Sequence, residues 1–483
     1  MVFSSTIFLF LFLPVVLALA IPLRPVWAQN AFLLAASLLF YAWGESYYIG
    51  AMLICMGINY VFSLALAALE GRPTARKWAL GLAIACNLGV LIFYKYTDFI
   101  IAAANWALAP LLGITIAARH VHLPLGVSFF TFHAISYVVD VYRGHAKAER
   151  NPLNMALYIA LFPQLVAGPI VRFRDIAERI RSRRVSLRGF SEGVERFVIG
   201  LAKKTIIANP LGAVADQIFS LPPDALNFSL AWLGAVAYTF QIYFDFSGYS
   251  DMAIGLGKML GFRFPENFNY PYISRSIKEF WRRWHITLSS WFRDYLYIPL
   301  GGSKKGPWRT YANLVTVFFL CGLWHGASWT FVAWGLYHGF FLVLERAWPK
   351  VMGPLAASWT GRLYALPVVV VGWVIFRADN AGLAAAMLGA MAGFGAGDGL
   401  EHNVWILMTP SKWLLLALGA LCSTPFWKSL KNLHRRWPLD SRGAIWARGA
   451  ILAGRYAYLM ILLIISAGAL ALGAYNPFIY FRF

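Results

Sequence analysis

Residues 280–295 read FWRRWHITLSSWFRDY, and residues 321–326 read CGLWHG. The first stretch mixes Trp and Tyr with Arg and interrupts the apolar runs on either side of it. Such a mixture is typical of the level of the lipid headgroups, where indole and phenol rings prefer to lie. The second stretch places His325 inside an apolar run that extends over residues 311–345. Together they predict an interfacial or re-entrant segment followed by a polar group at membrane depth.

The composition excludes an ordinary soluble protein. The 483 residues are 60% hydrophobic and 13% charged, with a mean hydropathy of +0.61. Average soluble domains have about 45–50% apolar and about 25% charged residues. Apolar runs of about 17–25 residues recur along the chain, and each is long enough to cross a bilayer as a helix. We therefore expect an all-α, polytopic membrane protein whose residues 1–483 form one domain.

The spans expected from these runs are spread over the whole chain. The N-terminus lacks the basic region of a signal peptide, so the first run is expected to remain as a helix. The run 157–168 is too short to span, and the Gly/Ala-rich stretch 380–400 is expected to be only partly embedded. The expected spans are 6–22, 29–43, 48–69, 78–94, 97–116, 124–142, a long segment from Ala231, the run 311–345, 364–376, 412–427 and 452–474.

The net charge of +21 comes from Lys and Arg in the loops between these runs. Basic loops favour the cytoplasmic side, so 71–77 and 428–448 would lie there. The Arg-rich segment 172–188 would join them, touching anionic lipid headgroups or holding an anion. Counting every span above places the basic loop 143–150 on the other side, which indicates that one earlier segment is broken or re-entrant. The sequence has no soluble basic domain that would bind a nucleic acid.

Polar side chains inside apolar runs are candidates for a site, because a charge at the bilayer centre costs about 3 kcal/mol. Asp245, Ser247 and Asp251 lie in the segment that begins near Ala231, where structural hydrogen bonding and substrate binding explain them equally well. Arg293 and Asp294 are further candidates for the wall of a cavity. The four cysteines lack metal-ligand spacing, and no His-Glu-x-x-His helix or nucleotide-binding loop occurs, so we expect no metal.

His325 is the best candidate for chemistry. Trp324, Gly326 and Trp329 surround it in sequence and would build a tight cavity that excludes water. A neutral imidazole there is suited to accept a proton from a substrate hydroxyl near neutral pH. His285 is the natural second polar group, although the sequence does not show whether the two histidines meet. The alternative for each is a core histidine whose hydrogen bonds are satisfied.

Several motifs taken together resemble the membrane-bound O-acyltransferase superfamily. The resemblance is concentrated in residues 124–345 and includes the polysaccharide-acetylating bacterial branch of the superfamily. The motifs are FWRRWHITLS at 280–289, WFRDY at 291–295, PLGG at 299–302, LWHG at 323–326, LGVSFFTF at 125–132, FPQLVAGPI at 162–170, FDFSGYSD at 244–251 and PFIYFRF at 477–483.

This resemblance implies a bundle of membrane helices around a central cavity. His325 matches the buried essential histidine of the family, and His285 matches its other recurrent polar position. The implied activity is that of a multi-pass acetyltransferase of the bacterial inner membrane without a bound cofactor. An acetyl group from a cytoplasmic donor, acetyl-CoA, would pass across the membrane to a periplasmic acceptor protein, which would then modify an exported polysaccharide such as alginate.

Three other functions are compatible with parts of the sequence. Within the superfamily, the donor could be a carrier-protein thioester used for D-alanyl transfer to teichoic acid. The acetylated polymer could equally be cellulose or peptidoglycan. Outside the class, the intramembrane polar groups could belong to a transporter, which would predict paired discontinuous helices in two repeats. The sequence shows no such repeat.

Overall fold

The computed structural model describes residues 1–426, 442–473 and 475–477; for residues 442–448 it describes only the path of the backbone. This part of the chain is helical without strands, which confirms the all-α class. Within it, four helices are long and apolar enough to cross a membrane, or five if one bent pair counts as a single span. They are Ile49–Ala68, Pro73–Leu112, Leu187–Phe219 and Gly449–Ala471, with Pro349–Ala357 and Gly361–Arg377 as the bent pair.

Most elements follow one another with short connections, except for the longer segments 113–126, 260–270 and 395–403, and π or 3-10 segments carry the label η. Those of the first half are η1 (Phe8–Phe12), α1 (Leu13–Ala20), α2 (Val26–Ala42), α3 (Ile49–Ala68), α4 (Pro73–Leu112), α5 (Val127–Tyr142), α6 (Pro152–Ala160), α7 (Phe162–Leu165), α8 (Phe173–Arg181), α9 (Leu187–Ala202), η2 (Lys203–Ala208), α10 (Asn209–Phe219), η3 (Pro223–Ala225) and α11 (Phe228–Met259). Those of the second half are η4 (Pro271–Ile273), α12 (Ile277–Arg283), α13 (Ile286–Phe292), η5 (Arg293–Tyr297), α14 (Gly306–His325), α15 (Trp329–Ala347), α16 (Pro349–Ala357), α17 (Gly361–Arg377), α18 (Ala381–Gly389), η6 (Ala390–Phe394), α19 (Val404–Leu407), α20 (Pro410–Cys422) and α22 (Arg442–Ala471).

Helix α4 corrects the expected order of spans. It is one helix of 40 residues, so the prediction of separate spans at 78–94 and 97–116 is wrong. The polar residues between those two runs do not end the helix, because Lys95 and Tyr96 hydrogen-bond to carbonyl oxygens of residues 323–325. Counting one span here moves the basic loop 143–150 to the side of the first basic loop. The apparent topology conflict therefore came from counting one helix twice.

Contacts between loops define two faces of the bundle. Arg76 donates to the carbonyl oxygen of Val141 at 3.2 Å, so the loop before α4 lies beside the end of α5. Arg143 in turn donates to the carbonyl of Asp294 at 3.0 Å. We call this end, formed by residues 71–77, 143–150 and 293–306, the basic face. At the other end the backbone N–H of Leu125 donates to Glu45 at 3.2 Å. We call that end, formed by residues 44–48 and 113–126, the opposite face.

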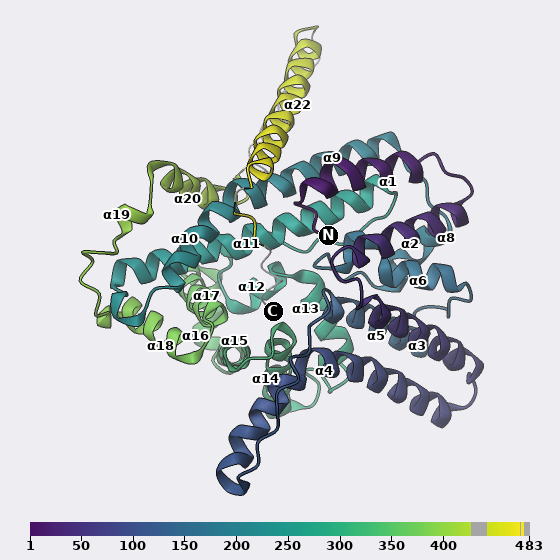
Figure 1. Cartoon of the computed structure of the whole chain (residues 1–483), viewed down its shortest axis with the longest axis horizontal. Helices are drawn as coiled ribbons and strands as arrows, with labels where there is room; N and C mark the ends of the chain where they lie inside the picture. The colour runs from purple at the N-terminus through teal and green to yellow at the C-terminus, as the bar shows by residue number, and fades with distance from the viewer. Residues whose placement is uncertain (427–441, 474, 478–483) are drawn as a thin grey trace.

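Helix α11 crosses the middle of the bundle, with α9 and α10 alongside it (Figure 1). Its side chains are buried along almost the whole length. The approach to α9 is close because glycines face each other: a Cβ on Gly248 would lie 2.7 Å from the carbonyl oxygen of Gly200. Small residues permit such backbone contact between membrane helices. Helix α22, in contrast to α11, is not enclosed by other helices. It projects from one edge of the bundle and exposes most of its described side chains (Figure 1).

Residues 277–297, which include the Trp- and Arg-rich stretch 280–295, fold into three short pieces, α12, α13 and η5. Each is too short to span a membrane. The prediction of an aromatic belt at headgroup level is only half right. Trp281, Trp284 and Trp291 are all buried, at 7%, 3% and 7% exposure. Arg282 is exposed on the other side of α12. The tryptophans therefore form part of the protein core, whereas Arg282 and Arg293 of the same stretch are exposed.

The apolar run 311–345 forms a hairpin of two helices. Helix α14 ends at His325, and α15 begins at Trp329. The two helices touch through backbone, since a Cβ on Gly322 would lie 2.3 Å from the carbonyl oxygen of Phe331. His325 is thus placed at a helix end beside a tight helix crossing, and not in the interior of one long helix.

The remaining regions agree in part with expectation. Residues 157–168 form the ends of α6 and all of α7, and they are buried inside the protein, as non-helical backbone at membrane depth must be. The Gly/Ala-rich stretch 380–400 is helical up to Phe394. The predicted basic loop 428–448 lies outside the described residues up to 441, and its end belongs to α22.

Candidate functional site

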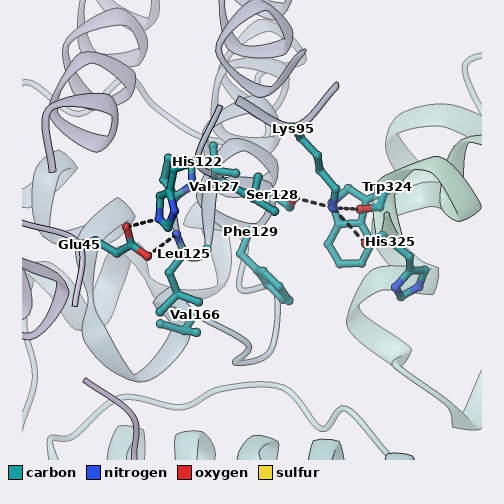
Figure 2. A pocket seen from close by; sticks show the side chains of 13 residues that line it. Glu45, Lys95, His122, Leu125, Val127, Ser128, Phe129, Val166, Trp324 and His325 are labelled. Atoms are coloured by element: carbon teal, nitrogen blue, oxygen red, sulfur yellow. Dashed lines mark hydrogen bonds and ion pairs between the residues drawn. The ribbon is translucent and has the colours of Figure 1, made fainter. Parts of the chain in front are cut away.

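A cavity of about 270 Å³ extends from the opposite face to His325. Figure 2 shows Glu45 and His122 at one side of it and Lys95, Trp324 and His325 at the other. Its lining residues are Glu45, Lys95, His122, Leu123, Pro124, Leu125, Gly126, Val127, Ser128, Phe129, Val166, Trp324 and His325.

Glu45 and His122 hold the rim of this cavity in place. The carboxylate of Glu45 lies 3.1 Å from Nε2 of His122 and also accepts the N–H of Leu125. The imidazole of His122 stacks on Tyr48 with ring centroids 4.6 Å apart. A second carboxylate, Asp98 on α4, accepts the backbone N–H groups of residues 119–121 at 2.7–3.1 Å. The long connection between α4 and α5 is therefore tied down on both sides.

His325 occupies a cage of aromatic rings at the inner end of the cavity. It is 7% exposed. Its ring centroid lies 4.9 Å from that of Trp324, 5.0 Å from that of Trp334 and 5.1 Å from that of Phe376, and all three contacts are edge-on. Such a cage keeps bulk water away from the imidazole while the cavity leaves one approach open.

His285 is held by a side chain that the sequence did not single out. It caps α13 in a left-handed conformation, with φ of +42°, which is uncommon for a residue with a side chain. Nδ1 of His285 lies 3.0 Å from Oδ1 of Asn267, and the amide nitrogen of Asn267 donates to Ser250 at 3.0 Å. Oδ1 is therefore the acceptor, Nδ1 carries the proton, and Nε2 of His285 keeps its lone pair. Among the described residues, none forms a hydrogen bond with that Nε2.

The two histidines meet around one indole. The ring of Trp324 lies 6.3 Å from that of His285 and 4.9 Å from that of His325, centroid to centroid. On the side toward the basic face, Phe132 stacks on Trp324 at 5.3 Å and on Trp291 at 3.8 Å. The structure thus brings His285, Trp324 and His325 into one cluster, whereas the sequence left open whether the two histidines meet.

The other predicted site residues lie away from the cavity. Asp245 forms a buried ion pair with Lys204 at 2.8 Å, and Asp251 pairs with Lys203 and with Arg196, each at 2.6 Å. These pairs tie α11 to η2 and α9 and have a structural role. Ser247 on the same helix is buried, 1% exposed, and does not line the cavity.

Trp329 and the pair at residues 293–294 are also outside the cavity. Trp329 is 64% exposed and contacts Phe99, so Trp334 takes the place expected for it beside His325. Arg293 and Asp294 lie at the basic face, where Asp294 pairs with Arg293 at 2.6 Å and Arg172 at 2.8 Å. Burial alone would raise the pKa of Asp294, but these two cations outweigh it and lower the pKa.

Sequence reasoning missed Lys95, Asn267 and Glu45. Lys95 did carry a signal, since a lone cation in an apolar run is by default a candidate for function. That signal was lost when the run was divided at residues 95–96. Asn267 and Glu45 lie in short connections and acquire their roles only through partners distant in sequence. In the part of the chain that the structure describes, no group of three or more His, Cys, Asp or Glu residues could hold a metal ion.

Comparison with known proteins identifies the family. The model of the membrane-bound O-acyltransferase family, MBOAT, matches residues 145–381. The chain is 43% identical to the probable alginate O-acetylase AlgI of Pseudomonas putida, with 100% of each chain covered. The chain belongs to the membrane-bound O-acyltransferase family.

This family membership makes the protein an O-acyltransferase. It is 48% identical to the probable alginate O-acetylase AlgI of Azotobacter vinelandii, over 82% of this chain and 79% of that protein. It is also 35% identical to the peptidoglycan O-acetyltransferase of Helicobacter pylori, over 81% of this chain and 80% of that protein. The match to the protein of Pseudomonas putida covers the whole chain and so includes the cavity, both histidines and the α14–α15 hairpin. The family model includes both histidines and the hairpin but begins after Glu45, Lys95 and residues 122–129 of the cavity.

Proposed function

We propose that this protein is a multi-pass acetyltransferase of the bacterial inner membrane that passes an acetyl group from cytoplasmic acetyl-CoA to a periplasmic acceptor. The acceptor protein would then acetylate an exported polysaccharide, for which alginate is the first candidate because the most similar relatives reported above are alginate O-acetylases. The observation that carries the proposal is the cavity that runs from the opposite face to His325, away from the basic loops.

The orientation follows from charge and helix length. Basic loops favour the cytoplasm, so the basic face is the donor side. Along α4, roughly 28 Å of helix separates Arg76 from Lys95, and along α14 roughly 30 Å separates Lys305 from His325, at about 1.5 Å per residue. Both lengths match a hydrocarbon core of about 30 Å. His325 and its cavity therefore lie toward the periplasmic side.

The chemistry needs one base and a dry environment. In the proposed step, the imidazole of His325 accepts the proton of an acceptor hydroxyl. The oxygen attacks the acetyl carbonyl carbon, a C–O bond forms, and the C–S bond of the thioester breaks. The leaving thiolate takes up the proton from His325, so the base is regenerated. Nε2 of His285, whose orientation Asn267 fixes, assists by accepting or relaying the same proton, and Trp324 between the two histidines excludes water.

The size and charge of the cavity support a protein side chain as the immediate acceptor. At about 270 Å³ it lies just below the range of about 300–1,000 Å³ that is usual for small-molecule sites. A single side chain or one sugar unit fits such a space, whereas a polymer chain does not pass through it. Glu45 at the rim would repel a polyuronate such as alginate. An intermediary hydroxyl therefore fits better than the polysaccharide itself.

Acetyl transfer by vesicles that contain the full chain tests the proposal. Labelled acetyl-CoA is supplied on the basic-face side, and label is followed into protein and polysaccharide on the other side. We expect H325A to abolish transfer and H285A to reduce it, while H402A, a histidine in the loop before α19, leaves it unchanged. Retained transfer by H325A at normal membrane levels would contradict the assignment.

The same assay separates the alternatives. Incorporation that requires an alanyl carrier protein and ignores acetyl-CoA would indicate D-alanyl transfer. Movement of intact donor across the membrane without a covalent product would indicate transport. Purified cellulose and peptidoglycan, offered beside alginate together with the periplasmic fraction of the same cells, identify the final polymer.

A further inference from the structure

Lys95 stands out among the groups that the mechanism does not use. It lies in the apolar part of α4 and lines the cavity beside His325 (Figure 2). Its ammonium donates to the carbonyl oxygen of Trp324 at 2.6 Å and to that of His325 at 3.1 Å, with Ser128 at 3.4 Å as a third, weaker contact. An ammonium has three N–H donors. All three are thus directed at α14 and α5.

The carbonyls that Lys95 binds are those that a helix leaves unpaired. The last four carbonyls of any α-helix lack an N–H partner within it. Because α14 ends at His325, the carbonyls of Leu323, Trp324 and His325 belong to this group. The hydroxyl of Tyr96 donates to the carbonyl of Leu323 at 2.7 Å. Two successive residues of α4 therefore satisfy the last three carbonyls of α14.

Charge also favours this arrangement. The C-terminal end of a helix carries a partial negative charge, which a cation stabilises. The ammonium lies 6.0 Å from the centre of the Trp324 ring, within reach of a weak cation–π contact. A neutral or shorter side chain at position 95 would leave the end of α14 without a partner.

We propose that Lys95 is the positioning residue of His325: its ammonium caps α14 and so fixes the backbone from which the imidazole projects into the aromatic cage. Tyr96 completes the cap one carbonyl earlier. The expected effect of Lys95 on acetyl transfer rests on the proposed function. Its capping of α14 rests on the geometry alone. Lys95 acts through the helix end, because two of its donors are directed at carbonyl oxygens of α14 and the third at the hydroxyl of Ser128.

The first test compares K95M with K350M, both in the full chain in lipid nanodiscs. Met keeps most of the volume of Lys but has no donor, and Lys350 is an exposed lysine in α16, outside the basic face and the cavity. A displacement of about 1 Å at a catalytic group lowers the rate about 100-fold, and we expect that loss for K95M and none for K350M. Amide hydrogen exchange over residues 321–327 should become at least about tenfold faster in K95M alone, since an uncapped helix end frays.

Chemical rescue distinguishes the hydrogen bonds from the charge. K95A leaves a space that opens into the cavity, so methylammonium added from the opposite face can occupy it. We expect methylammonium to raise the transfer rate of K95A at least about tenfold. Tetramethylammonium, which has the charge but no N–H donor, should leave that rate unchanged. Equal rescue by both cations would overturn the capping role.

The exchange measurement separates this inference from the proposed function. If the unmodified chain transfers no acetyl group from any donor, the proposed function fails, yet faster exchange at residues 321–327 in K95M still supports the cap. If exchange there is the same in K95M as in the unmodified chain, Lys95 does not hold α14 and the inference is wrong, whatever the transfer rate.

Discussion

Asn267 offers the sharpest test of how the two histidines are held. Its side chain accepts from Nδ1 of His285 at 3.0 Å and from the backbone and hydroxyl of Thr287 at 3.3 and 2.9 Å, and it donates to Ser250 at 3.0 Å. Replacement by Leu removes all four bonds with little change in volume. Replacement by Asp keeps Oδ1 as an acceptor and puts a second oxygen in place of the amide nitrogen, toward which the hydroxyl of Ser250 can turn to donate.

The expected loss follows from these bonds. A buried group that loses its hydrogen-bond partner costs about 1–3 kcal/mol. If that energy is lost from the orientation of His285 in the transition state, acetyl transfer by N267L slows about 5- to 150-fold, at 1.36 kcal/mol for each factor of about ten. N267D should stay within about fivefold of the unmodified enzyme, since it still orients Nδ1–H. The free energy of unfolding of N267L should fall by about 2–3 kcal/mol.

The assay measures initial rates of acetyl transfer together with thermal unfolding in detergent. N269L serves as the control, because Asn269 is exposed and only two residues away. We expect its rate and stability to be unchanged within about 0.5 kcal/mol. If N267L transfers acetyl as fast as N267D while both remain folded, the orientation of His285 does not contribute to the reaction, and its role as assisting group is refuted.

Three further substitutions test other parts of the structure. K204M removes the ammonium that pairs with the buried Asp245, so thermal unfolding should show a loss of about 3–5 kcal/mol, most of which K204M/D245N should recover. G322A forces a Cβ against backbone and should cost at least about 2 kcal/mol and most of the acetyl transfer, whereas G339A, with its nearest atom at 3.4 Å, should cost less than about 1 kcal/mol. E45A frees the rim of the cavity and should raise the KM for the acceptor about fivefold with little change in kcat; a fall in kcat alone would contradict a binding role.

The features that local sequence determines were predictable. Apolar run length indicated a helical membrane protein, and the motif around His325 indicated the histidine that the structure places at the end of the cavity. These properties depend on neighbours in the chain. Burial of a tryptophan depends instead on which face of its helix another helix covers. Trp281 and Trp284 were therefore expected at the headgroups and are found in the core, and Trp329 was expected beside His325 and is found exposed.

Polar residues at membrane depth were the hardest to interpret, because their meaning depends on partners far away in sequence. Asp245 and Asp251 looked like site residues, yet Lys204 and Lys203 on η2 neutralise them. Lys95 was expected in a short connection between two spans, yet it lies within α4 and its partners lie in α14. A charge in an apolar run shows that a partner exists, and only the fold shows which.

Both histidines are placed where helices end, and this has a physical consequence for the enzyme. His285 begins α13 in a left-handed turn, and His325 ends α14. Helix ends leave backbone groups unpaired and fray unless another element binds them. Asn267 supplies that restraint for His285, and Lys95 supplies it for His325. The geometry of the site therefore depends on α4 and on the loop after α11 as much as on the motifs that carry the histidines. A substitution in α4 or in that loop can abolish acetyl transfer although both histidines are still present.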